Sequence, residues 1–385
     1  MSWPMVSIES VAKVITGKTP PKADPNCFGG NIPFITPSEL TDSDYLLKPE
    51  TTLTEKGLAT TKLIPKNSIL VCCIGSLGKM AIADLPVATN QQINSVIFDD
   101  DKIYYRFGFY ALKLLKNDLK KIAPSTTVAI INKSRFSELK IPCPPLEEQK
   151  RIATILDKAD GIHKKREQAI KLADDFLRAK FLEMFGTPAN NIHRFPKGTI
   201  RDLVDSVNYG TSAKASIDSG EYPILRMGNI TYQGRWDFTD LKYLDLSVKE
   251  KDKYLVKEGD LLFNRTNSKE LVCKTAVYEE DRPMAFAGYL IRVRPNSIGN
   301  NYYISGYLNS IHGKITLMNM CKSIVGMANI NAQELQNIEI LIPPKHLQDE
   351  YEIIYKKIKK GLSIYDKSAM QLQLLASNLS NKYFM

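Results

Sequence analysis

A polar run in the second half of the chain carries residue types that contact nucleic acids. It directly follows the apolar residues LLF and consists of Asn264, Arg265, Thr266, Asn267, Ser268 and Lys269. Arginine, lysine and asparagine read base edges, while lysine, arginine and hydroxyl groups hold phosphates. A strand that ends at Phe263 would deliver this run to a sheet edge. The alternative interpretation is a surface turn, since turns are rich in the same residue types.

The first half of the chain contains corresponding candidates in two short stretches. Gly75, Ser76, Gly78 and Lys79 are small or basic residues that would let a backbone approach phosphate. Asn90, Gln91 and Gln92 follow shortly afterwards and carry amides suited to base edges. For these three amides the alternative is hydrogen bonding inside the domain.

Weaker candidates lie in the proline- and glycine-rich loops near the start of each half. They are Lys18, Lys22, Lys214, Arg226 and Asn229. Basic residues in exposed loops often serve only solubility.

No pattern in the chain indicates catalysis or metal binding. The GKT at Gly17 and the GK at Gly78 lack the upstream glycine of a phosphate-binding loop. The acidic run Asp99 to Asp101 is typical of a turn. The six cysteines show no CxxC spacing, which favours buried reduced thiols. We therefore predict a binding protein with no catalytic residue, no metal site and no cofactor of its own.

Composition sets the bounds for the fold and the partner. A length of 385 residues with 43% apolar and 24% charged residues is typical of a globular chain with two or more domains. A net charge of +10 permits a polyanionic partner. No apolar run reaches membrane-spanning length and the start lacks the form of a signal peptide, so we expect a cytoplasmic protein without a membrane segment.

One long helix is predicted between Leu146 and Phe185. It follows Pro144 and Pro145, contains no proline, and ends before Gly186. At 1.5 Å per residue its length would be about 60 Å. Apolar residues at three- and four-residue spacing form a narrow stripe that calls for a partner helix, namely Ile152, Ile155, Ala159, Ile162, Ala169, Ala173 and Phe176.

The partner is an internal repeat at the end of the chain. Residues 340–385 align with the first stretch without a gap at an offset of 348 − 149 = 199, which places Gln149 on Gln348 and Pro144 on Pro343. We predict two long helices related by a pseudo-twofold axis. In that arrangement Arg166 would lie near Tyr365 at the middle of the pair.

The globular halves repeat the same order of elements. In the first half, strands are predicted around Ile32–Ile35, Ser68–Ile74, Lys79–Ala83 and Ile93–Phe98, then a helix over Tyr104–Leu119. The second half returns this order at Tyr222–Ile230, Val256–Leu262, Ala285–Val293 and Tyr302–Met320. The prediction is an α+β fold with a first domain at 1–145, a helix at 146–186, a second domain at 187–344 and a second helix at 345–385.

Several of these stretches resemble the specificity (S) subunit of type I restriction-modification systems. The resemblance is carried by Ile130–Asp160 with its PPLEEQ start, the weaker copy Ile330–Pro344, GSLGKMAI at Gly75, ATNQQI at Ala88, and GDLLFNRTNSKELVCKTAV at Gly259. It covers nearly the whole chain. The second copy departs from the pattern, with KHLQDEY in place of LEEQKRI.

The resemblance implies two target recognition domains, each reading one half of a bipartite DNA sequence. It also implies that the two long helices pack antiparallel and hold these domains apart. It also implies double-stranded DNA, two methyltransferase (M) subunits and restriction (R) subunits as partners. S-adenosylmethionine, Mg and ATP would be needed only in those partner subunits.

Two other classes of function are alternatives to this one. Charge and a helical rod alone would also suit an interaction scaffold for a protein or RNA partner. A self-sufficient adenine methyltransferase would need an (N/D)PP(Y/F) tetrapeptide, whereas the Pro-Pro pairs here read TPPK, CPPL and IPPK.

Overall fold

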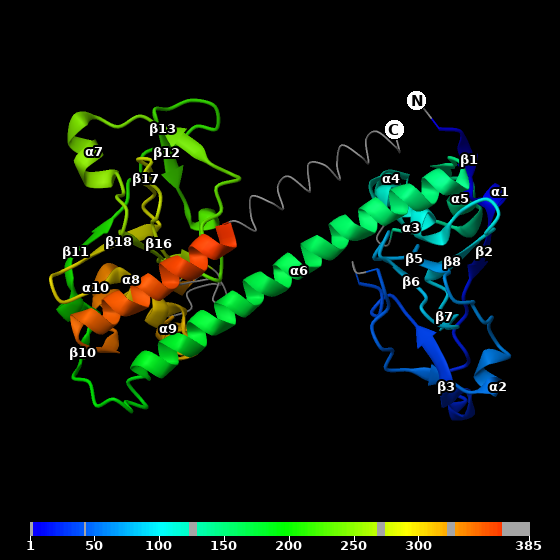
Figure 1. Ribbon diagram of the computed structural model, residues 1–385, viewed down its shortest axis with the longest axis horizontal. Coiled ribbons are helices and arrows are strands. Elements are labelled where there is room, and N and C mark those ends of the chain that lie inside the picture. Colours follow the sequence, from blue (N-terminus) through cyan, green and yellow to red (C-terminus); the bar gives the residue numbers. More distant parts are fainter. Residues whose placement is uncertain (1–2, 42–43, 123–128, 268–273, 322–327, 364–385) are drawn as a thin grey trace. The chain divides into compact units, whose positions relative to one another are not determined.

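The computed structural model of the chain describes residues 3–41, 44–122, 129–267, 274–321 and 328–363 (Figure 1). These residues form two compact units, with the division between Lys164 and Lys165. The division falls inside the longest helix, so one helix belongs to both units.

The first unit is built on a four-stranded antiparallel sheet in the order β2-β8-β5-β6. Its strands are β2 (Ala12–Thr16), β8 (Ile93–Phe98), β5 (Ile69–Cys72) and β6 (Met80–Ile82). Strands β5 and β6 are buried along their whole length, which explains why they read as continuous apolar runs. A smaller sheet has the order β4-β3-β7, from β4 (Thr52–Leu53), β3 (Phe28–Ile35) and β7 (Ala88–Thr89).

The second unit repeats both sheets. Its four-stranded sheet is β11-β18-β14-β16, from β11 (Val204–Tyr209), β18 (Leu290–Pro295), β14 (Leu261–Asn264) and β16 (Thr275–Val277). Its smaller sheet is β13-β12-β17, from β13 (Lys242–Leu244), β12 (Tyr222–Leu225) and β17 (Ala285–Phe286). Ile69 pairs with Ile82 in the first unit as Leu261 pairs with Val277 in the second. The predicted internal repeat is therefore present in the strand order and in the register.

The remaining elements are short. The first unit adds β1 (Met5–Ser7), α1 (Ile8–Val11), η1 (Pro25–Cys27), α2 (Glu55–Leu58), α5 (Lys133–Ser137) and β9 (Lys140–Pro142). The second adds β10 (Lys197–Thr199), η2 (Ile200–Leu203), η3 (Met227–Asn229), α7 (Val248–Tyr254), β15 (Thr266–Asn267), β19 (Ala328–Asn329), α10 (Ala332–Gln336) and β20 (Glu339–Leu341). The pairs β1-β9 and β10-β20 join the start of each unit to the segment before its long helix.

The helix predicted in each globular half is broken in two. The first half contains α3 (Tyr105–Leu114) and α4 (Lys116–Ile122), and the second contains α8 (Asn301–Asn309) and α9 (Ile311–Met320). Ser310 ends α8 and begins α9, because its hydroxyl accepts a hydrogen bond from the Gly313 amide at 3.0 Å. The apolar spacing continues across this break, and so the two single helices predicted from it were wrong.

The long helix α6 (Leu146–Phe185) has the predicted bounds. It ends because Gly186 adopts φ +65°, a left-handed conformation, while its amide bonds to the Leu182 carbonyl at 2.8 Å. Ile152 and Leu156 bury their side chains in the first unit, and Phe181 and Phe185 bury theirs in the second. Two stripe residues, Ile162 and Phe176, are 43% and 50% exposed.

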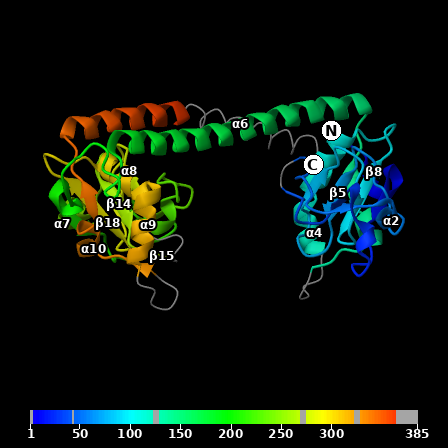
Figure 2. The same ribbon diagram turned by 90° about the horizontal axis from the view of Figure 1, so that it is seen from below.

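A second helix covers residues 345–363 and packs against the end of α6 in the second unit (Figures 1 and 2). Tyr351 contacts the rings of Phe181 and Phe185, with centroids 5.3 and 5.9 Å apart. Asp174 and Lys359 line one cavity farther along the same pair of helices. Low residue numbers on one helix thus face high numbers on the other, which makes the pair antiparallel. Tyr365, predicted to lie near Arg166, is outside the described residues.

Each long helix begins with a buried glutamine that bonds to its own unit. The Gln149 amide donates to the Lys102 and Pro144 carbonyls, both at 2.8 Å. Gln348 donates to the Ile298 carbonyl at 3.0 Å and the Pro343 carbonyl at 2.8 Å. Both side chains are fully buried. The two helices are therefore seated on their units in the same way.

We expect Gln149→Ala to lower the free energy of unfolding of the first unit by about 1–3 kcal/mol, because two carbonyls and the Tyr104 amide lose their partner in a dry site. Urea unfolding measures the change. Glu147→Ala is the control, since that side chain is 88% exposed on the same helix turn. Equal stability of the two variants would contradict the role given to Gln149.

Candidate nucleic-acid interface

The turn between β5 and β6 presents the first group of predicted residues. Gly75 and Gly78 have φ angles of +79° and +76°, which favour glycine. Gly75 and Ser76 are exposed, Lys79 is half-buried, and Gly78 is buried against Lys116. The turn therefore exposes backbone and a hydroxyl at one end of the four-stranded sheet.

Two neighbouring loops meet this turn at the same end of the sheet. The Cys73 amide donates to the Gln92 carbonyl at 2.8 Å, which joins the turn to the β7–β8 loop. The Gly75 amide donates to the Ala129 carbonyl at 2.9 Å. Lys18, which is exposed, follows β2 and donates its amide to the Thr89 carbonyl at 2.9 Å. The structure thus brings together three of the predicted stretches of the first half.

The three amides of the β7–β8 loop differ in where they point. Asn90 is buried, and its amide donates to the Gln92 side-chain oxygen at 3.0 Å. The Asn90 side-chain oxygen accepts from the Gln92 backbone amide at 3.0 Å. Gln91 is exposed and accepts a bond from the Thr19 hydroxyl at 2.6 Å. Asn90 and Gln92 therefore bond inside the domain, and Gln91 is the amide of the three that reaches the surface.

The polar run of the second unit occupies the equivalent turn, between β14 and β16. The Arg265 amide donates to the Tyr289 carbonyl at 3.1 Å, as Cys73 does to Gln92 in the first unit. The Ile330 amide donates to the Arg265 carbonyl at 3.0 Å. The two candidate sites are therefore the same place in the two repeats.

Arg265 is held above the sheet end by side chains from two other strands. Its guanidinium donates to the Asn329 side-chain oxygen at 3.2 Å and lies 4.8 Å from the centre of the Tyr209 ring. Thr266 pairs with Asn329 in the short ladder of β15 and β19, and its hydroxyl also bonds to Asn329. These contacts orient the arginine while leaving it partly exposed.

The remaining members of the run fall into two groups. Asn264 is fully buried at the end of β14, and its side-chain nitrogen has no hydrogen-bond partner in the described part of the chain. It supports the turn from below and does not reach the surface. Asn267 pairs through its backbone with Ala328. Ser268 and Lys269 lie outside the described residues.

The weaker candidates of the second unit are mostly engaged within it. Asn229 is buried and donates to the Asp237 and Asp240 carbonyls at 2.9 and 3.0 Å. Arg226 bonds to the Asp240 carboxylate at 2.8 Å. Lys214 is exposed. Asn229 therefore has a structural role, while Lys214 remains available at the surface.

Sequence reasoning missed four residues that complete this end of the second unit. They are Tyr209, Tyr289, Asn329 and Lys274; the two tyrosines are 40% and 58% exposed. Burial lowers the pKa of the Lys274 ammonium. The Lys274 backbone carbonyl accepts a hydrogen bond from the Asn264 backbone amide at 2.8 Å. Tyr289 occupies the position of Gln92 in the repeat, so a residue-by-residue alignment of the halves is the signal that would have found it.

Other kinds of site are not evident in the described ranges. Those residues contain no group of three or more histidines, cysteines or acids placed to hold a metal ion. None of their helices combines the length and apolar character needed to cross a membrane.

The fold and the two equivalent turns define a duplicated binding protein in which each unit presents polar loops at one end of its sheet. The chain belongs to the family described as type I restriction modification DNA specificity domain, whose model matches residues 2–172 and 195–376.

Whole-length relatives support this assignment. The chain is 22% identical to the type I restriction enzyme MjaIX specificity subunit of Methanocaldococcus jannaschii, over 99% of this chain and 92% of that protein. It is 23% identical to the EcoKI specificity subunit of Escherichia coli, over 98% and 86% of the two chains. The crystal structure of a type I restriction-modification S subunit from M. genitalium has the same fold, with a TM-score of 0.66, 17% identity, and coverage of 100% and 96%.

We expect Gly75→Ala to destabilise the first unit by about 1–2 kcal/mol although nothing lies within 4 Å of the added methyl, since the cost is the left-handed backbone itself. Ser76→Ala is the control in the same turn. Thermal unfolding measures both. A Gly75→Ala variant as stable as the parent would mean that the turn adopts another conformation in solution.

Proposed function

We propose that this chain is the sequence-specific DNA-binding specificity subunit of a type I restriction-modification complex. Each globular domain would read one half of a bipartite DNA target. The observation that carries the proposal is the repeated turn, since Gly75–Lys79 and the run from Asn264 occupy the same place in two copies of one fold. One scaffold with two different polar turns suits the reading of two different half-sites.

The contacts proposed for DNA follow from exposure. In the first domain, Lys18, Ser76, Lys79 and Gln91 would contact DNA, with the Gly75 backbone near phosphate. In the second domain, Arg265 and Thr266 would read bases or hold phosphate, joined by Lys214, Ser268 and Lys269 as predicted from the sequence. The stacked Tyr209 pre-organises Arg265, which reduces the entropy lost when the arginine binds.

The rest of the proposal concerns partners and chemistry. The long helices would scaffold two methyltransferase subunits, and restriction subunits would join through them. The chain itself would be non-catalytic, with S-adenosylmethionine, Mg and ATP needed only in the partner subunits. The relatives are named as specificity subunits of type I restriction enzymes, which supports this division of labour. A subunit of such a complex would act in the cytoplasm.

A duplex-binding assay with the methyltransferase subunits tests the proposal as a whole. Specific binding should weaken steeply with salt, because phosphate contacts release counterions. Preference for RNA, or equal affinity for all duplexes, would favour a general interaction scaffold instead.

Arg265→Ala should relax recognition of one half-site at a cost of about 1–3 kcal/mol per lost base contact, with the other half-site unchanged. Lys79→Ala should affect recognition of the other half-site only. Sequencing of the methylated motif in cells that express the complex gives the result.

Arg201→Ala is the matched control for Arg265. Arg201 also bonds to an asparagine, Asn337 at 3.1 Å, but it precedes β11 at the opposite end of the sheet. Loss at both half-sites from Arg265→Ala would mean that the turn supports folding or assembly.

A longer α6 tests whether this helix sets the spacing of the half-sites. Insertion of four residues after Ile170 adds about 6 Å of helix, while DNA advances about 3.4 Å per base pair. The methylated motif should keep both half-sites and gain a spacer of about one to two base pairs. An unchanged spacer in a folded, active complex would show that the partner subunits set the separation.

A further inference from the structure

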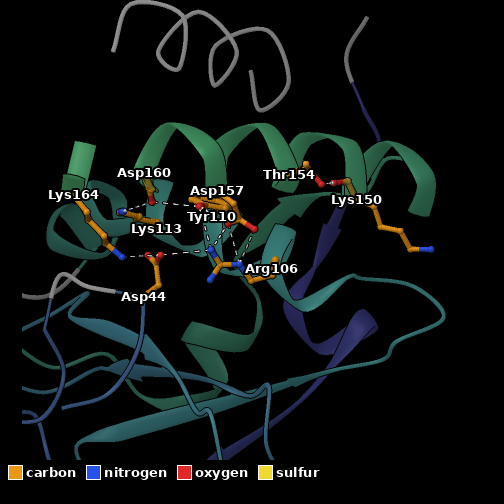
Figure 3. Close-up of polar contacts among 9 residues, drawn as sticks. All are labelled: Asp44, Arg106, Tyr110, Lys113, Lys150, Thr154, Asp157, Asp160 and Lys164. Atoms are coloured by element: carbon orange, nitrogen blue, oxygen red, sulfur yellow. Dashed lines mark hydrogen bonds and ion pairs between the residues drawn. The ribbon is translucent and has the colours of Figure 1, made fainter. Parts of the chain in front are cut away.

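The start of α6 brings negative charge to the first unit. Asp157 lies over α3 and bonds to the Arg106 guanidinium, with Nε 3.0 Å from Oδ1, and to the Tyr110 hydroxyl at 2.7 Å (Figure 3). One turn farther along, Asp160 lies 3.8 Å from the Lys113 ammonium. The Arg106 side chain is only 7% exposed. The domain also places the buried Asp44 carboxylate 3.5 Å from Arg106 and 3.1 Å from Lys164, farther along α6. At Asp157 and Asp160 the domain thus offers a buried and a half-buried cation to two acids of the helix.

The start of the second long helix brings positive charge to the second unit. The Lys356 ammonium lies 3.5 Å from the Glu258 carboxylate and 5.1 Å from the centre of the Tyr302 ring. Burial raises the pKa of the Glu279 carboxyl, and the nearby ammonium groups of Lys359 and Lys356 oppose that rise. The carboxylate nearest to Lys356 is Glu352 of the same helix at 2.8 Å. The domain adds the acids Glu258 and Glu279 and an aromatic face to the surroundings of the two lysines.

These positions are equivalent in the repeat, and the sign of the charge is reversed. The offset of 199 that places Gln149 on Gln348 also places Asp157 on Lys356 and Asp160 on Lys359. On the domain side, Arg106 and Tyr302 each lie two residues after the N-cap of the helix that faces the long helix. At this contact, the helix contributes acids and the domain contributes cations in the first unit, whereas in the second unit the helix contributes lysines and the domain contributes acids.

The glutamine seats alone would not tell the two helix starts apart, because both use the same amide bonds to backbone carbonyls. Exchange of identical elements between copies is a low-cost route to wrong assemblies. We infer that complementary charge makes each helix start specific for its own domain, so that the pairing of one helix start with the other domain is disfavoured. The domain that Asp157 fits is one with a buried arginine, and Lys356 fits one with acids and an aromatic ring.

The wrong pairing would be rejected by like charge. A lysine at the position of Asp157 would face the buried Arg106, and an aspartate at the position of Lys356 would face Glu258 and Glu279. The glutamine bonds hold each helix in register, so the wrong charge would lie beside the domain. Solvent would weaken the repulsion at the position of Lys356, whose side chain is 45% exposed. Specificity of this kind depends on repulsion in the wrong complex as much as on attraction in the right one.

The test gives each long helix the charge that the other helix carries at the equivalent position and leaves the apolar contacts unchanged. In the full chain, Asp157→Lys should reduce hydrogen-exchange protection of α3 by roughly 100- to 1,000-fold, since the buried Arg106 guanidinium keeps only the Asp44 carboxylate at 3.5 Å and meets a cation. Asp157→Asn should cause a clearly smaller loss, because it removes the charge without adding repulsion. Glu147→Lys, an exposed charge reversal on the same helix, should leave α3 unchanged.

A double variant distinguishes a specific charge pairing from general destabilisation of the domain. The double variant Asp157→Lys with Arg106→Tyr reproduces the lysine and tyrosine of the second unit, and it should recover most of the lost protection. Lys356→Asp should in turn loosen α8 more than Lys356→Gln does; this site is half exposed, so the variant should still fold. Equal loss for the lysine and asparagine variants at Asp157, or no recovery in the double variant, would overturn the inference.

Discussion

The buried glutamine at the start of each long helix is the constraint on which the rest of the structure depends. A primary amide without solvent must find partners, and Gln149 and Gln348 find them in the carbonyls of their own units. These bonds fix both the axial position and the rotation of the helix. Ile152 and Leu156 then reach the core of the first unit, and Asp157 reaches Arg106. Since α6 continues without a break into the second unit, its placement begins at this amide.

The sequence predicted the elements that depend on local signals. The bounds of α6 follow from a proline pair, a glycine and the absence of breakers between them, and the structure confirms them. The repeat order follows from apolar runs that are buried on both faces of a sheet. The breaks at Leu115 and Ser310 escaped prediction, because the helical pattern continues on both sides of each. At Ser310, capping by the serine hydroxyl competes with that pattern.

The direction of a polar side chain was harder to predict than its position. Asn264, Asn90 and Asn229 all fall where surface amides were expected, yet each is buried. Asparagine suits both a base edge and an internal turn, and only the contacts with other segments decide between them. Arg106 and Asp157 show the same limit, since their pairing joins residues of two different helices. Composition and spacing do not reveal which helix face meets which charge.

The loops proposed to read DNA are joined to one another mainly through backbone bonds. Cys73 and Arg265 donate their amides to the carbonyls of Gln92 and Tyr289, and these four side chains have nothing in common. A bond between backbone groups tolerates almost any residue except proline at the donor. The side chains at this end of the sheet can therefore differ between the two units without loss of the shared fold. The helix seats work in the opposite way, because their side chains carry the bonds, and a change there alters which helix a domain accepts. The side chains proposed to read DNA can thus vary at one end of each unit, while the contact between each domain and its own long helix stays the same.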